Sequence, residues 1–292
     1  MNMIAFSKST ESHSMQMIIG GLLLGTIGIF VFNAGQPPVT TVFFRSLFGC
    51  IALGIWMGFH RNLKELKVSP KSLLAVSVTG TLMASIWWLY FLSLNYISVG
   101  LATLVYHLQP FWLILLSAVM FRENINRSTV IVLIAALVGL TLATGVFDDL
   151  NLKTDERFLL GIGLCMVGSV LYAIATLIAK SNSQISPMSF AWWQCLVSAF
   201  VTSWSFALNA SPIIETAWFW LISLGVIHSG LAFTLIYSGM SKLPTSRIAV
   251  LQFIYPGAAL LVDWVYFDHS FTLTQWFGVA LLVSSLWSLK RG

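Results

Sequence analysis

Long runs of apolar residues separated by short polar stretches are the feature that most restricts how this chain can fold. There are ten such runs, and they cover residues 15–34, 38–59, 72–94, 98–121, 129–147, 158–179, 187–208, 216–239, 244–267 and 272–289. Each run is close to the about 20 residues that a helix needs to cross a bilayer. The runs do not alternate between apolar and polar residues, as membrane strands do. They therefore predict an all-α integral membrane protein with ten transmembrane helices.

The composition agrees with a membrane protein and excludes several soluble classes. Of the 292 residues, 58% are apolar and 9% are charged, and the mean hydropathy is +0.87. A soluble domain has about 25% charged residues. This difference excludes a soluble enzyme, a nucleic-acid-binding protein and a disordered protein. The cysteines, Cys50, Cys165 and Cys195, lie inside apolar runs and predict buried thiols rather than a disulfide framework.

Basic residues predict the orientation of the chain, because Lys and Arg gather in cytoplasmic loops. If residues 1–14 are a cytoplasmic tail, 12 of the 15 basic residues fall on the inner side. These are Lys8, Arg61, Lys64, Lys67, Lys71, Arg122, Arg127, Lys180, Lys242, Arg247, Lys290 and Arg291. The outer side then receives Lys153 and Arg157, and Arg45 lies within the membrane. We therefore expect both termini in the cytoplasm, with the first apolar run retained as a helix rather than cleaved as a signal peptide.

A hydrophilic stretch at mid-chain, residues 148–157, divides the predicted helices five and five. The two halves, 15–147 and 158–290, share a pattern, because Pro110 and Pro256 lie 146 residues apart and an apolar run follows each of them. Five is an odd number, so the second half must enter the membrane in the opposite orientation. Inverted repeats with proline-broken helices at matching positions are typical of secondary transporters that bind substrate near mid-membrane. Prolines that kink helices for packing alone are the other interpretation.

Short motifs spread over residues 15–290 resemble a known family. In chain order they are Phe43-Phe44-Arg45, the stretch from Ala102 to Pro110, Phe121-Arg122-Glu123, Gly139, the stretch from Ala249 to Pro256, Asp263-Trp264 and Gln275-Trp276-Phe277-Gly278. Their order and spacing resemble the EamA-like ten-helix permeases of the drug/metabolite transporter superfamily. The resemblance implies two five-helix bundles around a central cavity in the bacterial cytoplasmic (inner) membrane. It also implies alternating access, and export of metabolites more often than import.

Polar side chains deep in the membrane are the candidate substrate-binding residues, because such groups are costly in lipid. His107 lies about nine residues into its helix, near mid-membrane, and one turn before Pro110. Tyr106 and Gln109 flank it, so that three polar side chains crowd the predicted helix break. An imidazole can bind substrate or carry a proton near neutral pH. A histidine that only packs between helices is the alternative.

The other candidates lie near mid-membrane, in the outer half of the predicted helix 72–94, or beside the second proline. They are Trp87, Tyr90, Tyr172, His228, Tyr237, Gln252 and Tyr255, with Pro256 as the second helix break. Trp87 and Tyr90 share a helix face and form either a cavity wall or part of the interfacial aromatic belt.

Arg45 has two interpretations that the sequence leaves open. It lies about seven residues from the outer end of its helix, and Asp263 lies near the outer end of another helix. In the functional interpretation Arg45 anchors a substrate carboxylate. In the structural interpretation, which the sequence favours, it extends to the membrane surface or satisfies helix-end carbonyls. A pair with Asp263 is compatible with either.

These features favour a secondary transporter of a small metabolite, more often an exporter, with an amino acid or a related zwitterion as substrate. The acidic residues fall in tails, loops or helix ends, so that no carboxylate lies near mid-membrane to hold an organic cation. Transport of organic or quaternary ammonium cations or drugs through an aromatic cage is the alternative. Proton coupling through His107 or His228 and uncoupled transport are both open.

Other classes of membrane protein fit the sequence less well. The motifs H-E-x-x-H and G-x-S-x-G are absent, so we expect no enzyme, no cofactor and no metal site. A sensor or an assembly factor would carry a soluble appendage or a dry apolar interior, and paired broken helices suit alternating access better than a channel. The expected partners are the substrate and the lipid bilayer, without nucleic acid, and the protein is a monomer or a homodimer.

Overall fold

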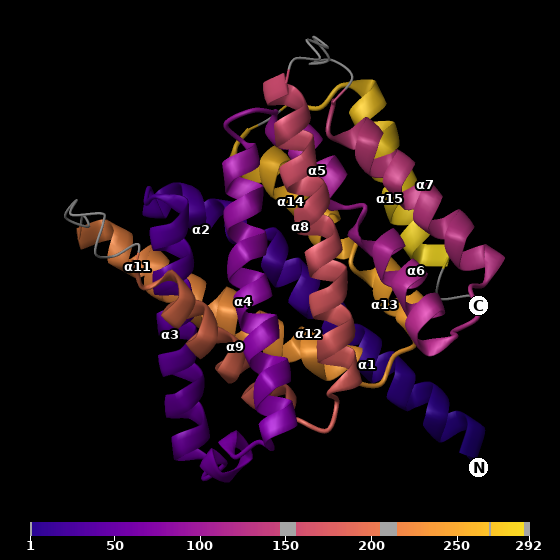
Figure 1. Ribbon diagram of the computed structural model, residues 1–292. Coiled ribbons are helices and arrows are strands. Elements are labelled where there is room, and N and C mark those ends of the chain that lie inside the picture. Colours follow the sequence, from indigo (N-terminus) through magenta and orange to yellow (C-terminus); the bar gives the residue numbers. More distant parts are fainter. Residues whose placement is uncertain (1, 147–155, 205–214, 269, 289–292) are drawn as a thin grey trace. The chain divides into compact units, whose positions relative to one another are not determined.

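A computed structural model describes residues 2–146, 156–204, 215–268 and 270–288. The regular elements within these residues are helices, and no strand occurs among them (Figure 1), which confirms the prediction of an all-α fold. The chain divides into two compact units, each built from both halves of the sequence. Unit 1 holds Met1–Trp87 and Ala175–Leu243, and unit 2 holds Trp88–Ile174 and Pro244–Gly292. Most of the predicted linker at 148–157 lies outside the described residues.

Unit 1 is built around α3, which packs against α9 and the π-helix η2. Its elements are α1 (Asn2–Gly25), α2 (Ile27–Ala34), α3 (Pro38–Phe59), the 3-10 helix η1 (Leu63–Leu66), most of α4 (Pro70–Ser93), the end of α8 (Glu156–Ser181), α9 (Pro187–Thr202), α11 (Glu215–Ser223), η2 (Leu224–Ala232) and α12 (Phe233–Met240). Both α3 and α9 begin with a proline, whose fixed φ suits the first position of a helix. A Cβ atom on Gly49 of α3 would lie 2.8 Å from the Ser229 Cβ atom, so that glycine lets α3 and η2 approach closely.

Unit 2 is built around the pair α7 and α15. Its elements are the end of α4, α5 (Val99–Tyr106), α6 (Gln109–Phe121), α7 (Arg127–Ala143), most of α8, α13 (Thr245–Leu251), α14 (Ile254–Tyr266) and α15 (Leu273–Ser288). Two glycines from the motifs bring α7 and α15 together. A Cβ atom on Gly139 would lie 2.6 Å from the backbone nitrogen of Leu282 and 2.9 Å from the carbonyl oxygen of Gly278. The two backbones are thus in direct contact, as in membrane helix pairs with small residues at the interface.

Among the described residues, seven helices are long and apolar enough to cross a membrane, by length and composition. They are Thr10–Ala34, Pro38–Phe59, Pro70–Ser93, Val99–Phe121, Glu156–Ser181, Glu215–Met240 and Thr245–Tyr266. Each overlaps one of the ten predicted segments. The helices α7 and α15 are apolar but shorter, and α9 is described as far as Thr202. The total of ten spans and the inverted repeat therefore stay predictions.

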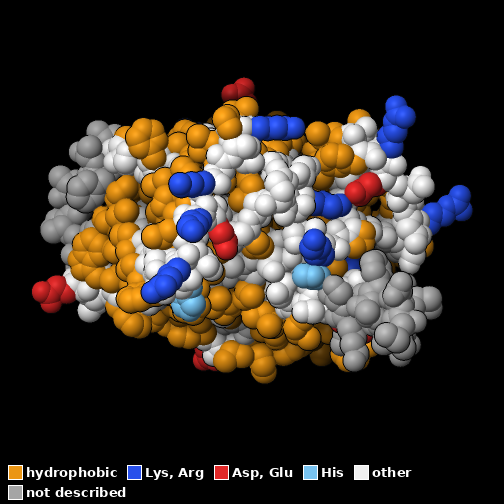
Figure 2. Space-filling model, turned by 90° about the horizontal axis from the view of Figure 1, so that it is seen from below, with side chains coloured by type: hydrophobic (Ala, Val, Ile, Leu, Met, Phe, Trp, Pro, Cys, Tyr) orange, Lys and Arg blue, Asp and Glu red, His pale blue; other side chains and the backbone are white. Residues whose placement is uncertain are grey.

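Large apolar side chains are exposed on the helix surfaces, as lipid contact requires. Phe32, Val119 and Leu273 are 70%, 73% and 90% exposed. Figure 2 shows hydrophobic side chains spread over the face that it draws, with Lys and Arg side chains standing among them. A water-soluble monomer rarely exposes apolar surface so widely. The helix exteriors are therefore suited to a bilayer.

Two helices are interrupted next to prolines, and two more have irregular turns. The α5–α6 break lies just before Pro110 and the α13–α14 break just before Pro256, with His107 and Gln252 as the C-cap residues. A proline has no N–H for the carbonyl four residues earlier, which weakens the helix at that point. A turn at Thr26 separates α1 from α2, and η2 widens the helix between α11 and α12. These last two irregularities were not predicted.

Candidate functional site

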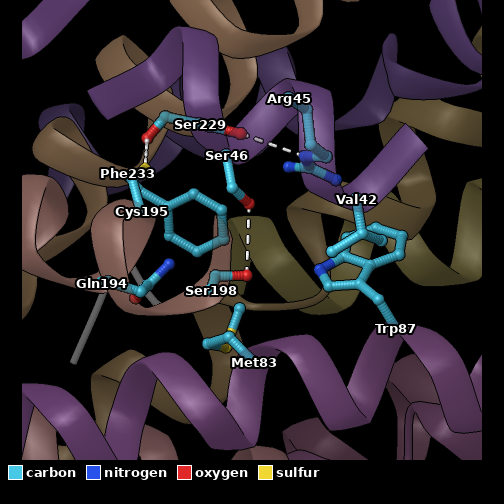
Figure 3. Close-up of a pocket in the computed structure, with 10 residues that line it drawn as sticks. All are labelled: Val42, Arg45, Ser46, Met83, Trp87, Gln194, Cys195, Ser198, Ser229 and Phe233. Atoms are coloured by element: carbon cyan, nitrogen blue, oxygen red, sulfur yellow. Dashed lines mark hydrogen bonds between the residues drawn. The ribbon is translucent and has the colours of Figure 1, made fainter. Parts of the chain in front are cut away.

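A small polar cavity lies inside unit 1 (Figure 3), between α3, α4, α9, η2 and α12. Its lining residues are Val42, Arg45, Ser46, Met83, Trp87, Gln194, Cys195, Ser198, Ser229 and Phe233. The space open to the centre of a water molecule is about 20 Å³, which is room for one or two waters. A metabolite would fit only after the surrounding helices separate.

Arg45 is the charged residue among the ten that line this cavity. Its side chain is only 4% exposed. Its Nε–H donates to the Ser229 hydroxyl at 3.0 Å, and its Cζ atom lies 4.7 Å from the ring centroid of Trp87. Figure 3 shows the guanidinium between the Ser229 side chain and the Trp87 ring. The cavity thus holds a fixed positive charge of the kind that pairs with carboxylates.

Uncharged polar groups and apolar groups complete the cavity. The Ser46 hydroxyl donates to the Ser198 hydroxyl at 3.1 Å, and the Cys195 thiol donates to the Ser229 carbonyl at 3.7 Å. The Tyr237 hydroxyl donates to the Gln194 side-chain oxygen, which holds that amide in place. The remaining wall is apolar, and comes from Val42, Met83, Trp87 and Phe233. The arrangement can hold a carboxylate group at Arg45 and offers polar and apolar surface for the rest of a ligand.

Gln194 also lines the cavity, and a spacing that occurs twice in the sequence relates it to Arg45. Arg45 lies seven residues after Pro38, and Gln194 lies seven residues after Pro187. Because both prolines begin their helices, Arg45 and Gln194 occupy the same turn of α3 and α9. The small polar residues Ser46, Ser198 and Ser229 were not predicted, because serine is common on packed membrane helices.

His228 lies in η2, next to Ser229, and its side chain is fully buried. Its Nε2 atom is 3.0 Å from the Thr26 hydroxyl, at the turn between α1 and α2. The Phe30 ring covers it, with ring centroids 4.7 Å apart. Of the predicted site residues, unit 1 therefore holds Arg45 and Trp87 at the cavity, Tyr237 behind its wall and His228 beside it.

Unit 2 brings other predicted site residues into a continuous chain of ring contacts. Tyr106 is its centre, with ring centroids 5.4 Å from Tyr90, 5.7 Å from Tyr172 and 5.7 Å from His107. His107 in turn lies 5.7 Å from Tyr255. Phe253, which was not predicted, also contacts His107, at 6.3 Å. The α5–α6 and α13–α14 breaks thus meet through aromatic rings.

Polar atoms at these two breaks are only partly satisfied. The His107 ring donates from Nδ1 to the Thr103 carbonyl at 2.7 Å, and Tyr90 bonds the Thr103 hydroxyl at 3.1 Å. The side-chain nitrogen of Gln109 and the side-chain oxygen of Gln252 are buried and have no hydrogen-bond partner among the described residues. Unpaired buried groups are costly, so these two mark a polar position where a ligand or water can bind.

Asp263 lies on α14 with an exposed side chain, and its predicted pairing with Arg45 stays a prediction. Within the described residues, no group of three His, Cys, Asp or Glu side chains is arranged to hold a metal ion.

Comparison with known proteins places the chain in a family. The model of the EamA-like transporter family matches residues 11–145 and 159–289. An uncharacterized transporter of Bacillus subtilis (strain 168) is 26% identical, over 96% of this chain and 90% of its own. A biotin transporter of Salmonella typhimurium is 24% identical over 70% of each chain. A solved crystal structure has a similar fold, with a TM-score of 0.82 at 19% identity over 94% of this chain and 96% of that chain. The protein is a multi-pass membrane transporter that belongs to the EamA-like transporter family.

Proposed function

We propose that this transporter carries a small metabolite with a carboxylate group, such as an amino acid or a related zwitterion. The observation that carries the proposal is the Arg45 guanidinium, buried inside a polar cavity of a membrane protein. A charged side chain at such a place is expensive and marks a functional site. Arginine offers a planar fork that pairs with both oxygens of a carboxylate. Arg45 is then the anion anchor rather than a structural residue.

The remaining cavity wall offers polar and apolar groups for the rest of the substrate. Ser46, Ser198 and Gln194 offer hydrogen bonds, and Trp87 and Phe233 offer apolar surface. Relatives in Salmonella and Escherichia coli are named biotin transporters, and biotin is a carboxylate with a polar ring system and an apolar chain. The shared chemistry is a single carboxylate on a mixed polar and apolar body.

Alternating access is the mechanism that we propose, because the cavity as it stands admits one or two waters. The substrate enters when the helices separate on one side and leaves when they separate on the other. Two five-helix repeats in opposite orientation, 15–147 and 158–290, would supply this symmetry, and the two stretches that the family model matches support them. In this account both termini lie inside, and export is the direction that the resemblance implies more often than import.

Counterflow in proteoliposomes tests this function. Vesicles loaded with unlabelled leucine, phenylalanine or biotin are diluted into the same labelled compound, with a labelled quaternary amine as a fourth probe. We expect saturable exchange of at least one carboxylate, lost in Arg45→Gln and kept in Arg61→Gln, an exposed arginine after α3. Equal exchange in Arg45→Gln and wild type would refute the anchor.

The aromatic chain of unit 2 favours a second candidate function, transport of an organic or quaternary ammonium cation. Tyr90, Tyr106 and Tyr172 present ring faces that attract a cation within about 6 Å. Quaternary-amine flux that is lost in Tyr106→Leu and kept in Arg45→Gln would support this candidate. Carboxylate flux with the opposite response would exclude it.

A further inference from the structure

We propose that His228 is a proton-binding site that couples this transporter to a proton gradient, a proposal that rests on the proposed role of Arg45. In it, binding of a carboxylate at Arg45 and binding of a proton at His228 favour each other. The proposal stands on three observations: the hydrogen bonds that fix the tautomer of His228, its burial in a π-helix, and its position relative to Arg45.

Thr26 fixes the tautomer of His228. The threonine hydroxyl has one proton, and it donates that proton to the Leu23 carbonyl at 2.8 Å. The contact of 3.0 Å between the hydroxyl and His228 Nε2 therefore requires the imidazole to donate from Nε2. A neutral imidazole carries one N–H, so Nδ1 keeps its lone pair. That atom is buried and has no hydrogen-bond partner among the described residues.

The burial of His228 and its place in a π-helix favour a functional role over packing alone. Its side chain is fully buried, in the π-helix η2 and against the turn at Thr26. π-Helical turns are rare and are frequent at functional sites. Nδ1 is therefore the ring atom that can still take a proton, and the charged imidazole needs a partner for the new N–H, such as a water that enters when the helices separate. The turn at Thr26 and the π-helix η2 are both irregular, so the two elements that hold His228 can shift when the helices separate.

Arg45 is the charged group that acts on this site. The elements packed against η2 are α1, α2, α3, α9, α11 and α12. Their titratable and charged side chains near η2 are Arg45 and Cys50 on α3, Cys195 on α9 and Tyr237 on α12. Farther away are Glu11 and His13, which precede Thr26 on α1 by 13 residues or more, and the exposed Glu215 at the start of α11.

The coupling follows from charge. Arg45 donates to Ser229, the residue next to His228, so its positive charge repels a second one on the imidazole. A carboxylate paired with Arg45 cancels that repulsion, and His228 can then take a proton on Nδ1 from the side to which the cavity is open. Both leave together on the other side, the proton to water and the carboxylate to solution. One proton thus moves with each carboxylate, and a gradient directed inward drives uptake, opposite to the export that the resemblance implies.

Flux driven by a pH gradient in proteoliposomes tests the coupling. The probes are labelled leucine, phenylalanine and biotin, and the variants are His228→Gln and, as a matched control, His60→Gln, an exposed histidine at the end of α3. Glutamine keeps an N–H for Thr26 but cannot be protonated. We expect His228→Gln to keep counterflow and to lose about tenfold or more of the accumulation driven by an alkaline interior. Accumulation equal to that of wild type would overturn the proposal.

Nuclear magnetic resonance separates a failure of this proposal from a failure of the Arg45 anchor. The probe is the full chain in nanodiscs, labelled with ¹⁵N-histidine, with His228→Gln to assign the signal. We expect the Nε2–H tautomer at pH 7, and proton uptake at a pH about one unit higher in Arg45→Gln than in wild type. The proton site is overturned if the tautomer is Nδ1–H, or if Arg45→Gln does not change the pH at which His228 takes up a proton. Either result holds whether or not any probe is transported. If neither result overturns it and no carboxylate exchanges, the Arg45 anchor alone has failed.

Discussion

A buried arginine defines the proposed site at the scale of single residues. Arg45 is held by Ser229 through Nε and by the Trp87 ring, so its orientation in the cavity is fixed before any substrate arrives. Preorganised donors bind an anion without the cost of ordering a flexible side chain. We therefore expect charge alone to be insufficient at this position.

Replacing Arg45 with lysine tests that explanation. Lysine keeps the charge but lacks both the planar fork and the Nε–H that binds Ser229. We expect Arg45→Lys to raise KM for the transported carboxylate by about tenfold, which corresponds to about 1.4 kcal/mol. Counterflow measured over a range of substrate concentrations gives KM, with Arg61→Lys as the control. An unchanged KM would mean that the fork is not used.

The hydrogen bond between Tyr237 and Gln194 is a second test at this scale. Tyr237→Phe leaves the Gln194 side-chain oxygen without that donor in a buried wall. We expect a loss of about 1–3 kcal/mol of stability. Thermal unfolding of the detergent-solubilised protein measures it. The control is Tyr96→Phe on unit 2, where a change of similar size would show that the effect is not specific to this bond.

At the scale of residues, the sequence draws attention to a residue that is unusual in a membrane and passes over one that is ordinary. Arginine in an apolar run is rare, so Arg45 was noticed, although the structural interpretation was preferred. Ser46, Ser198 and Ser229 were not predicted, because a serine in a membrane helix can hydrogen-bond a backbone carbonyl of its own helix and so does not indicate a site. The tautomer of His228 depends on Thr26, which is 202 residues away in sequence and so beyond local reasoning.

At the scale of helices, glycines decide which pairs can touch. Gly139 and Gly278 allow α7 and α15 to meet backbone to backbone. Adding a methyl group there moves one helix away from the other, whereas the same change on an open helix face adds helix propensity. The unit 2 core therefore depends on these two positions.

Gly139→Ala tests this contact. The new Cβ atom would lie 2.6 Å from the Leu282 backbone nitrogen, and that backbone cannot rotate away. We expect a loss of about 1–3 kcal/mol of stability. The matched variant is Gly163→Ala on α8, where an added Cβ meets nothing within 4 Å. A melting temperature that falls equally in both variants, or in neither, would contradict the role of Gly139.

Helices were more predictable than their irregularities. The apolar runs located the helices, because length and hydropathy are local properties. The interruptions beside Pro110 and Pro256 have a chemical signature in the sequence. The turn at Thr26 and the π-helix η2 have no such signature. They depend on the close approach of other helices, such as the approach of α3 to η2 at Gly49.

At the scale of the whole molecule, the central claim is that the Arg45 cavity is the path of the substrate. Cys195 is a native reporter of this claim, because its thiol lines the cavity and is 2% exposed. The other cysteines, Cys50 and Cys165, are also buried, and their replacement by alanine leaves one thiol to label. Alternating access requires this thiol to be reached when the cavity opens and protected when substrate fills it.

The most direct measurement is therefore the rate at which a small maleimide labels Cys195 in proteoliposomes, with and without the transported carboxylate. The account predicts that the carboxylate slows labelling by about tenfold at saturation in the protein with Arg45, and has no effect in Arg45→Gln. A carboxylate that is transported while the labelling rate of Cys195 stays the same would contradict the account, because the substrate would then cross the protein without entering this cavity.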